Sequence, residues 1–171
     1  MIGGDRMFEQ SELRVASQAD SARAGTGQRV VRRLLVIDDD NLHRMIICRA
    51  AAKAGYAPAG AATYDEAAQL VRDIVFDCIT LDLSLGEHAG VEMLRHLWVI
   101  GCKAPIIIIS GCDNATCAES EKVAESLKLN VWESIPKPVD LAVLRESLER
   151  LKASRDEPAA DAPHDPQLSP A

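Results

Sequence analysis

The chain has 171 residues, of which 47% are hydrophobic, so it holds enough apolar material for one compact domain but not for two. Its formal net charge of −7 disfavours non-specific binding to nucleic acid or to an anionic membrane, because both need a basic surface. The sequence also lacks a run of about 18 apolar residues, so no membrane span is expected.

The two ends of the chain differ in composition from its middle. Residues 1–30 are rich in small and polar side chains, and residues 154–171 contain prolines and little aliphatic mass. Both are predicted to be disordered tails, although a short helix that begins near Ser11 is an alternative for the first. The compact domain is therefore expected over residues 31–153.

Strand-like and helix-like segments alternate between these tails. The first strand is aliphatic without interruption, which is typical of a strand covered on both faces in a parallel sheet. The strands are expected at residues 33–38, 56–60, 77–82, 105–110 and 131–135, each followed by a helix. This alternation predicts an α/β fold with a doubly wound, five-stranded parallel sheet.

The helices carry signals of their own. Thr63 followed by Glu66 predicts a capping box at the start of the second helix. Four leucines spaced by three or four residues predict an apolar stripe on the last helix: Leu141, Leu144, Leu148 and Leu151.

Polar side chains stand where several of the strands end, and ligands bind at the carboxyl ends of strands in a doubly wound sheet. The side chains expected at this edge are Asp38, Asp39, Asp82, Ser110 and Lys137. Carboxylates alone would repel one another, whereas Mg²⁺ prefers oxygen ligands and would relieve that repulsion. The lysine and the hydroxyl suit an incoming phosphoryl group, whose oxygens need neutralising during transfer.

Other polar residues have simpler interpretations. Asp40 is interpreted as solvent-facing or as a helix cap, and Asp38 or Asp39 alone would also suit a cap. The histidines are scattered and are interpreted as structural or solvated: His43, His88, His96 and His164.

The cysteines form an odd set without a CxxC pair: Cys48, Cys78, Cys102, Cys112 and Cys117. Reduced thiols explain them best, and no secretory signal precedes them, so a cytoplasmic protein is expected. Cys112 and Cys117 lack companion histidines, which makes a metal site there a minor alternative.

Taken in order, the motifs resemble the receiver domain of bacterial two-component response regulators. The resemblance covers residues 33–152 and rests on the acidic pair after the first strand, CITLDLSLG around Asp82, PIIIISG with Ser110, and IPKP with Lys137. It implies a flavodoxin-like (βα)5 fold with strand order 2-1-3-4-5.

The resemblance also implies roles for single residues. Asp82 would accept a phosphoryl group from a phosphohistidine on a sensor kinase or phosphotransfer protein. Mg²⁺ would be held by three carboxylates and one backbone carbonyl: Asp38, Asp39, Asp82 and Ser84. Lys137 and Ser110, with Gly111 beside it, would bind the phosphoryl oxygens. The bond between Lys137 and Pro138 is expected to be cis.

Several positions, in the loop before Gly90 and in the last strand, depart from the family pattern. The usual Pro and Asp before Gly90 are missing, so Ala89 cannot cap the third helix with its side chain. Three residues before Lys137, where receivers usually carry Tyr or Phe, this chain has Ser134. Trp132 is expected on the same strand face by alternation, where it could take over part of the conformational role.

The function favoured by the sequence is that of a single-domain response regulator, a phosphoacceptor rather than a turnover enzyme, which signals by protein contacts without a DNA-binding output domain. The first alternative is a pseudo-receiver, a scaffold that binds partners without phosphorylation; the altered loop and the missing aromatic favour it. The second is a phosphohydrolase with Asp82 as nucleophile. Such enzymes commonly place a second acid where this chain has Ser84.

The first helix carries a candidate interface. The receiver pattern turns its aliphatic residues toward the sheet and leaves outside Met45, Cys48 and Ala52. This narrow stripe predicts helix packing in a homodimer or against a kinase's helical bundle, and the alternative is a surface patch without a role.

Overall fold

Strands and helices alternate along the part of the chain that the structure, a computed structural model, describes: residues 31–85, 89–111 and 122–156. The strands are β1 (Arg32–Ile37), β2 (Tyr56–Ala61), β3 (Cys78–Asp82), β4 (Ile106–Ser110) and β5 (Val131–Pro136). The helices are α2 (Asn41–Lys53), α3 (Tyr64–Asp73), α4 (Ala89–Val99) and α6 (Leu141–Asp156), with a further helical segment at residues 122–126. Within these described residues, no helix combines the length and the apolar character that a membrane crossing requires.

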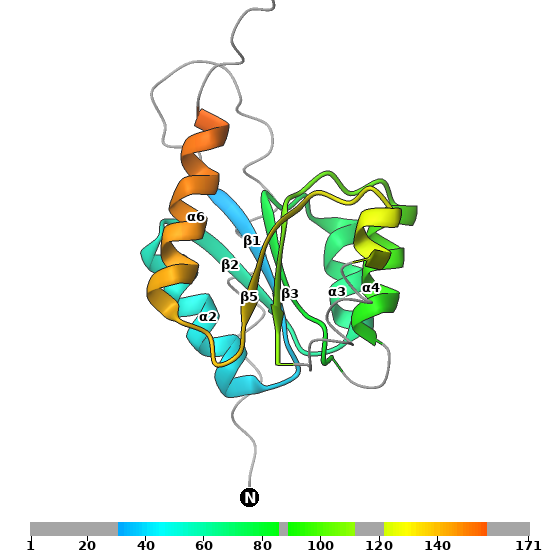
Figure 1. Cartoon of the computed structure of the whole chain (residues 1–171), viewed down its shortest axis with the longest axis horizontal. Helices are drawn as coiled ribbons and strands as arrows, with labels where there is room; N and C mark the ends of the chain where they lie inside the picture. Colours follow the sequence, from blue (N-terminus) through cyan, green and yellow to red (C-terminus); the bar gives the residue numbers. More distant parts are fainter. Residues whose placement is uncertain (1–30, 86–88, 112–121, 157–171) are drawn as a thin grey trace, which may run out of the picture. The chain divides into compact units, whose positions relative to one another are not determined.

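The strands form one parallel sheet in the order β2-β1-β3-β4-β5 (Figure 1). This confirms the expected doubly wound, flavodoxin-like α/β fold and the strand order that the receiver resemblance implies. Each predicted strand is correct to within one residue at either end. The strand order reverses between β1 and β3, so a ligand site is expected where these two strands end.

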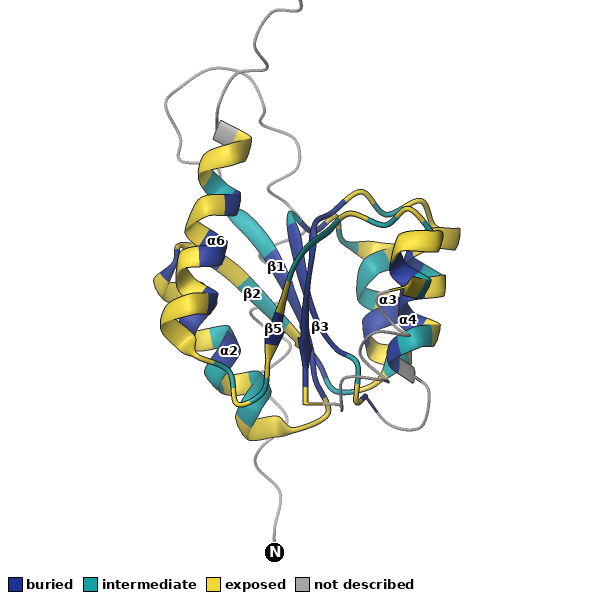
Figure 2. Ribbon diagram, in the orientation of Figure 1, coloured by how far each residue is buried: buried dark blue, intermediate teal, exposed yellow. Residues whose placement is uncertain are grey.

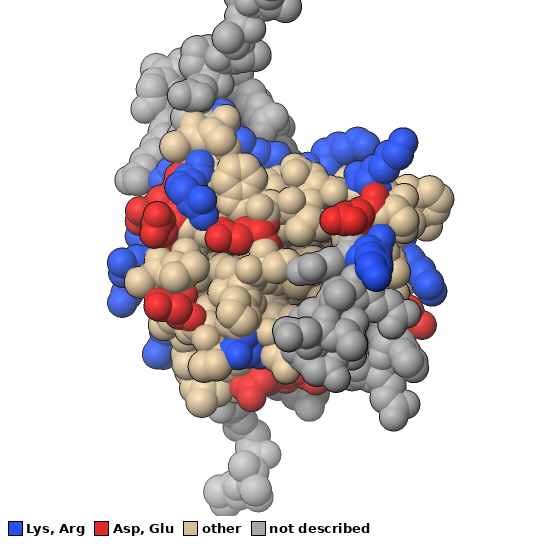
Figure 3. All heavy atoms as spheres, in the orientation of Figure 1, with Lys and Arg blue, Asp and Glu red and all other residues tan. Residues whose placement is uncertain are grey.

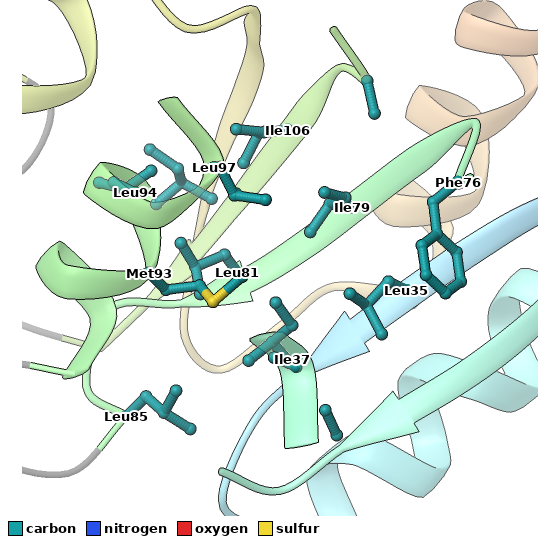
Figure 4. Close-up of a cluster of buried hydrophobic side chains, with 14 of the residues drawn as sticks. Leu35, Ile37, Phe76, Ile79, Leu81, Leu85, Met93, Leu94, Leu97 and Ile106 are labelled. Atoms are coloured by element: carbon teal, nitrogen blue, oxygen red, sulfur yellow. The ribbon is translucent and has the colours of Figure 1, made fainter. Parts of the chain in front are cut away.

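Helices cover both faces of this sheet, and the central strands between them are buried (Figure 2). In β1, Leu35 and Ile37 belong to the apolar cluster beneath α3 and α4, which Figure 4 shows in close-up. The alternate residues Leu34 and Val36 belong to the cluster beneath α2 and α6. Burial on both sides explains why the strand is aliphatic without alternation.

The predicted helix signals are largely confirmed. Thr63 Oγ1 accepts a hydrogen bond from the Glu66 N–H at 3.2 Å, and the Glu66 carboxylate accepts one from the Ala62 N–H at 2.7 Å. The apolar stripe on α6 is made by Leu144, Leu148 and Leu151, which are buried. Leu141 is 39% exposed and does not belong to it.

The prediction that Trp132 shares a face with Ser134 is wrong. Ile106 pairs with Val131, but the next residue of β4 pairs with Glu133, so the register shifts and Trp132 is the extra residue. Trp132 packs against the cluster beneath α2 and α6. Ser134 lies on the opposite face, beside a hollow of about 330 Å³. Simple alternation fails here because a bulge inserts one residue into the strand.

Several predicted segments lie wholly or partly outside the described residues: the tail at 1–30, the tail beyond 156, the altered loop at 86–88 and most of the helix after β4. α6 continues to Asp156. The last helix therefore extends three residues beyond the predicted domain end at residue 153.

Three cysteines in the described part of the chain are free thiols: Cys48, Cys78 and Cys102. Burial raises the pKa of the Cys78 thiol to about 12, so it stays protonated at neutral pH and unreactive. Cys112 and Cys117 lie outside the described residues.

Candidate functional site

The carboxyl ends of β1 and β3 bring the predicted acids together. Asp38 directly follows β1 and Asp82 ends β3, and each is only 1% exposed, whereas Asp39 is exposed. One carboxylate oxygen from each of the three lies within 4.8 Å of the others. Carboxylate oxygens are the hard ligands that Mg²⁺ and Ca²⁺ prefer, and the exposed Asp39 leaves the cluster open to solvent. The acids therefore fit a divalent cation.

Both oxygens of Asp82 have donors. Oδ1 accepts a hydrogen bond from the Ser84 N–H at 2.8 Å, and Oδ2 accepts one from Lys137 Nζ at 2.6 Å. These bonds fix the orientation of the carboxylate. The structure thus brings Ser84 to the site through its N–H, and the metal contact expected of its carbonyl stays a prediction.

Lys137 joins the two buried acids, because its Nζ also lies 3.4 Å from Asp38 Oδ2. Burial is the strongest single influence on the pKa of this amine and lowers it. The hydrogen bond and charge of Asp82, together with the charge of Asp38, outweigh burial and raise the pKa overall. The side chain therefore stays an ammonium ion, and it neutralises part of the acidic cluster.

Ser110 and Gly111 place the lysine. The Ser110 carbonyl accepts a hydrogen bond from the Lys137 N–H at 2.9 Å, which ties the end of β4 to the residue after β5. A Cβ atom added to Gly111 would lie 3.4 Å from Cβ of Lys137, so the glycine leaves room for the lysine stem. The bond between Lys137 and Pro138 is cis, as predicted.

A close approach of α4 fixes the turn that follows Asp82. A Cβ atom at Gly90 would lie 2.5 Å from the carbonyl oxygen of Leu83, which is inside van der Waals contact with backbone. Only glycine allows the start of α4 to pack this closely on the turn. The turn then presents the Ser84 N–H to the acceptor carboxylate.

Asp40 is a helix cap, as expected. It is the N-cap of α2, and its Oδ1 accepts a hydrogen bond from the His43 N–H at 2.9 Å. This bond is the main cause of the lowered pKa of Asp40. The third aspartate of the run therefore serves the helix and not the acidic cluster.

His43 lies at the site, a position that its interpretation as structural or solvated did not anticipate. Its Nδ1 contacts Asp38 Oδ2 directly. A signal for it existed in the sequence, because α2 begins three residues after Asp38 and its first turn lies at the same edge of the sheet. Arg44, the next residue, donates from Nη1 to the Asp38 carbonyl at 2.7 Å and so holds the backbone of the turn.

The structure places only two of the three residues of the candidate interface on the exposed face of α2. Met45 is 39% exposed and Ala52 is exposed, as expected. Cys48 is half-buried and packs against the cluster beneath α2 and α6, so it does not belong to the outer surface.

A doubly wound sheet with buried acids and a lysine at the ends of β1, β3 and β5 defines the class of protein, and comparison with known families agrees. The model of the response regulator receiver domain matches residues 34–149. The chain therefore belongs to this family, whose members act in two-component signalling and interact with histidine kinases.

Curated relatives show how far the likeness extends. The chain is 30% identical over 130 residues to the transcriptional regulatory protein ZraR of Salmonella typhimurium, a match that covers 76% of this chain and 28% of that protein. It is 28% identical over 121 residues to the chemotaxis protein CheY of Thermotoga maritima, covering 70% of this chain and 97% of that protein. The chain thus spans little more than a quarter of ZraR but nearly all of this CheY.

Solved structures agree with the fold. A response regulator from Colwellia psychrerythraea is 25% identical, with a TM-score of 0.65, and the match covers 72% of this chain and 98% of that one. A response regulator from Burkholderia pseudomallei is also 25% identical, with a TM-score of 0.58 and 73% of each chain covered. That second structure contains a phosphorylated aspartic acid, a calcium ion and citrate.

Proposed function

We propose that Asp82 accepts a phosphoryl group from a phosphohistidine of a sensor histidine kinase or of a phosphotransfer protein. In this transfer an Asp82 oxygen bonds to phosphorus while the bond between phosphorus and the histidine nitrogen breaks, which leaves an acyl phosphate on this chain. The observation that carries the proposal is the Lys137 ammonium at 2.6 Å from a buried carboxylate within the acidic cluster.

Mg²⁺ is the proposed cofactor, held by Asp38, Asp39 and Asp82. When bound, the cation supplies positive charge against the phosphoryl oxygens and the carboxylates. Support comes from the three carboxylate oxygens within 4.8 Å of one another. The calcium ion of the Burkholderia pseudomallei regulator is consistent with a cation at such a site in that protein.

The chain's own residues define which oxygen attacks. The Ser84 N–H holds Oδ1 of Asp82, and Oδ2 faces Lys137. We assign Oδ2 as the attacking oxygen, since the ammonium that now contacts it would lie next to the arriving phosphoryl oxygens. The charge that develops on those oxygens is then met by a cation already in place.

We further propose that the chain is a phosphoacceptor and not a turnover enzyme, because phosphohydrolases with an aspartate nucleophile commonly place a second acid where this chain has Ser84. The signal would then leave by contacts with a partner protein. Figure 3 shows both basic and acidic side chains on one face of the molecule, and the formal net charge of the chain is −7, so contact with nucleic acid is not part of the proposal.

Incubation with acetyl phosphate and Mg²⁺, followed by intact-mass measurement, tests the proposal. We expect one phosphoryl group on the parent chain and none on Asp82→Asn, since an amide is a poor nucleophile. Asp40→Asn is the matched control: it removes a neighbouring carboxylate but keeps an equally good helix cap, so labelling should persist.

Two outcomes would contradict the proposal. Equal labelling of Asp82→Asn and the parent would place the acceptor elsewhere. A parent chain that no small phosphodonor labels, and that a sensor kinase fails to label, would favour the pseudo-receiver.

A further inference from the structure

The contact between His43 and Asp38 has no role in the proposed function. His43 is the third residue of α2, and its ring is largely buried, with 21% of the side chain exposed. Nδ1 of the His43 ring contacts Asp38 Oδ2, and Asp38 Oδ1 accepts a hydrogen bond from the Asp40 N–H at 3.0 Å. The first turn of α2 therefore holds both oxygens of this buried acid.

The geometry excludes His43 as a fourth member of the acidic cluster. The ligand atoms within 4.8 Å of one another belong to Asp38, Asp39 and Asp82, and no His43 nitrogen is among them. His43 can therefore affect cation binding only indirectly, through its contact with Asp38. Because a carboxylate only accepts hydrogen bonds, the neutral ring must carry its proton on Nδ1 in this contact.

His43 also affects which of the two buried carboxylates Lys137 contacts. Asp38 Oδ2 lies 3.4 Å from Lys137 Nζ, and Asp82 Oδ2 lies 2.6 Å from it. Because the His43 imidazole already donates a hydrogen bond to Asp38, the attraction between Asp38 and Lys137 is weaker. The Lys137 ammonium therefore stays with Asp82. Without His43, Lys137 is the remaining side-chain donor to that oxygen in the described site, and it would be drawn toward Asp38 and away from the acceptor.

We propose that His43 is a positioning residue for the divalent-cation site: its Nδ1–H orients the Asp38 carboxylate and so raises the affinity of the cluster for Mg²⁺. The inference rests on the proposed function only in taking Mg²⁺ as the ion. Hydrogen-bond partners of this kind, which hold a ligand without touching the metal, change metal affinity by about 10- to 100-fold when they are removed.

The test measures Mg²⁺ binding by calorimetry on unphosphorylated protein without a phosphodonor. We expect His43→Ala to weaken binding about tenfold and His43→Asn, whose amide N–H can replace Nδ1–H, to stay within about threefold of the parent. His96→Ala is the matched control. His96 is also half-buried, and it is hydrogen-bonded to Tyr64 at 3.1 Å. It lies in the last turn of α4 and has no part in the acidic cluster, so Mg²⁺ binding should not change.

Each other outcome overturns the inference. Parent-like binding by His43→Ala would show that the contact only fills space, and equal losses in the Ala and Asn variants would show that the hydrogen bond is not what matters. A loss much larger for Mn²⁺ than for Mg²⁺ would make His43 a direct ligand. If the parent itself binds no Mg²⁺, this inference and the proposed cofactor both fail, whereas a parent that binds Mg²⁺ but is never phosphorylated contradicts the proposed function alone.

Discussion

At the scale of single residues, the acidic cluster carries more negative charge than Lys137 can neutralise. Asp38 and Asp82 are buried, and the cation that contacts both of them in the described part of the chain is Lys137. Asp39 adds a further carboxylate at the solvent edge. Buried like charges are costly, so the apo site stores repulsion that a divalent cation relieves. This argues for a binding role of the cluster over a purely structural one.

Asp39→Asn tests that argument. Removing one carboxylate should weaken Mg²⁺ binding, yet leave the apo protein as stable as the parent or slightly more stable, because repulsion in the cluster falls. The measurement is urea unfolding with and without Mg²⁺, since a ligand that binds only the folded state raises the free energy of unfolding. An equal gain from Mg²⁺ in mutant and parent would leave Asp39 without a role in the site.

The residues of the site were predictable to different degrees. Asp38, Asp82 and Lys137 follow from sequence because each lies at the carboxyl end of a predicted strand, and these ends meet at one edge of the sheet. The start of α2 three residues after Asp38 places His43 near the site, but it does not identify His43 as the partner of Asp38. Whether the ring of His43 reaches back to the sheet edge depends on the phase and side-chain rotamer of α2, which the order of residues does not reveal.

At the scale of elements, the central strands β1, β3 and β4 were predictable because they are buried on both faces of the sheet, so runs of mostly aliphatic residues mark them almost to the residue. The bulge in β5 was not, since it depends on the hydrogen-bonded partner in β4. Its consequence is functional. Trp132 faces α2 and α6 and cannot replace the aromatic that receivers usually carry at the position of Ser134, on the other face.

One contact between elements gives a pH-dependent prediction. The Tyr56 hydroxyl of β2 donates to the Leu148 carbonyl of α6 at 3.0 Å. Tyr56→Phe should lower the free energy of unfolding by about 1 kcal/mol at neutral pH, because the bond is lost while the ring stays. Burial raises the pKa of Tyr56 from 10.0 to about 12.

The sign of the pH effect follows from that raised pKa. The fold favours the protonated hydroxyl, so its contribution is complete below the unfolded pKa of 10.0 and is lost as the pH rises toward about 12. The difference between parent and Tyr56→Phe in urea unfolding should therefore shrink over this interval. A difference that stays constant with pH would show that the hydroxyl is not held as the structure places it.

At the scale of the whole molecule, the proposed phosphorylation of Asp82 can affect a partner protein only through the surface of the chain. The exposed face of α2 is lined by residues spaced three, four and three apart: Leu42, Met45, Arg49 and Ala52. Arg49 stands near the middle of this stripe, in place of the half-buried Cys48. In a two-fold symmetric dimer built on the stripe, a central residue lies near its own copy, so two arginines would meet and repel. We therefore favour an acidic helical partner over a second copy of this chain.

Reversing the charge of that central residue tests this preference. With a purified sensor kinase that phosphorylates the parent, Arg49→Glu should slow phosphotransfer about tenfold at low salt, because charges at an interface act mainly on the rate of association. Arg49→Lys keeps the charge and should transfer as the parent does. Labelling of both variants by acetyl phosphate should be unchanged, since Arg49 is exposed and lies more than two turns along α2 from the Asp40 cap. If Arg49→Glu transfers at the parent rate, α2 is not the docking surface. If light scattering instead shows a parent dimer that the substitution dissociates, the stripe binds a second copy of the chain, and the argument from arginine repulsion is wrong.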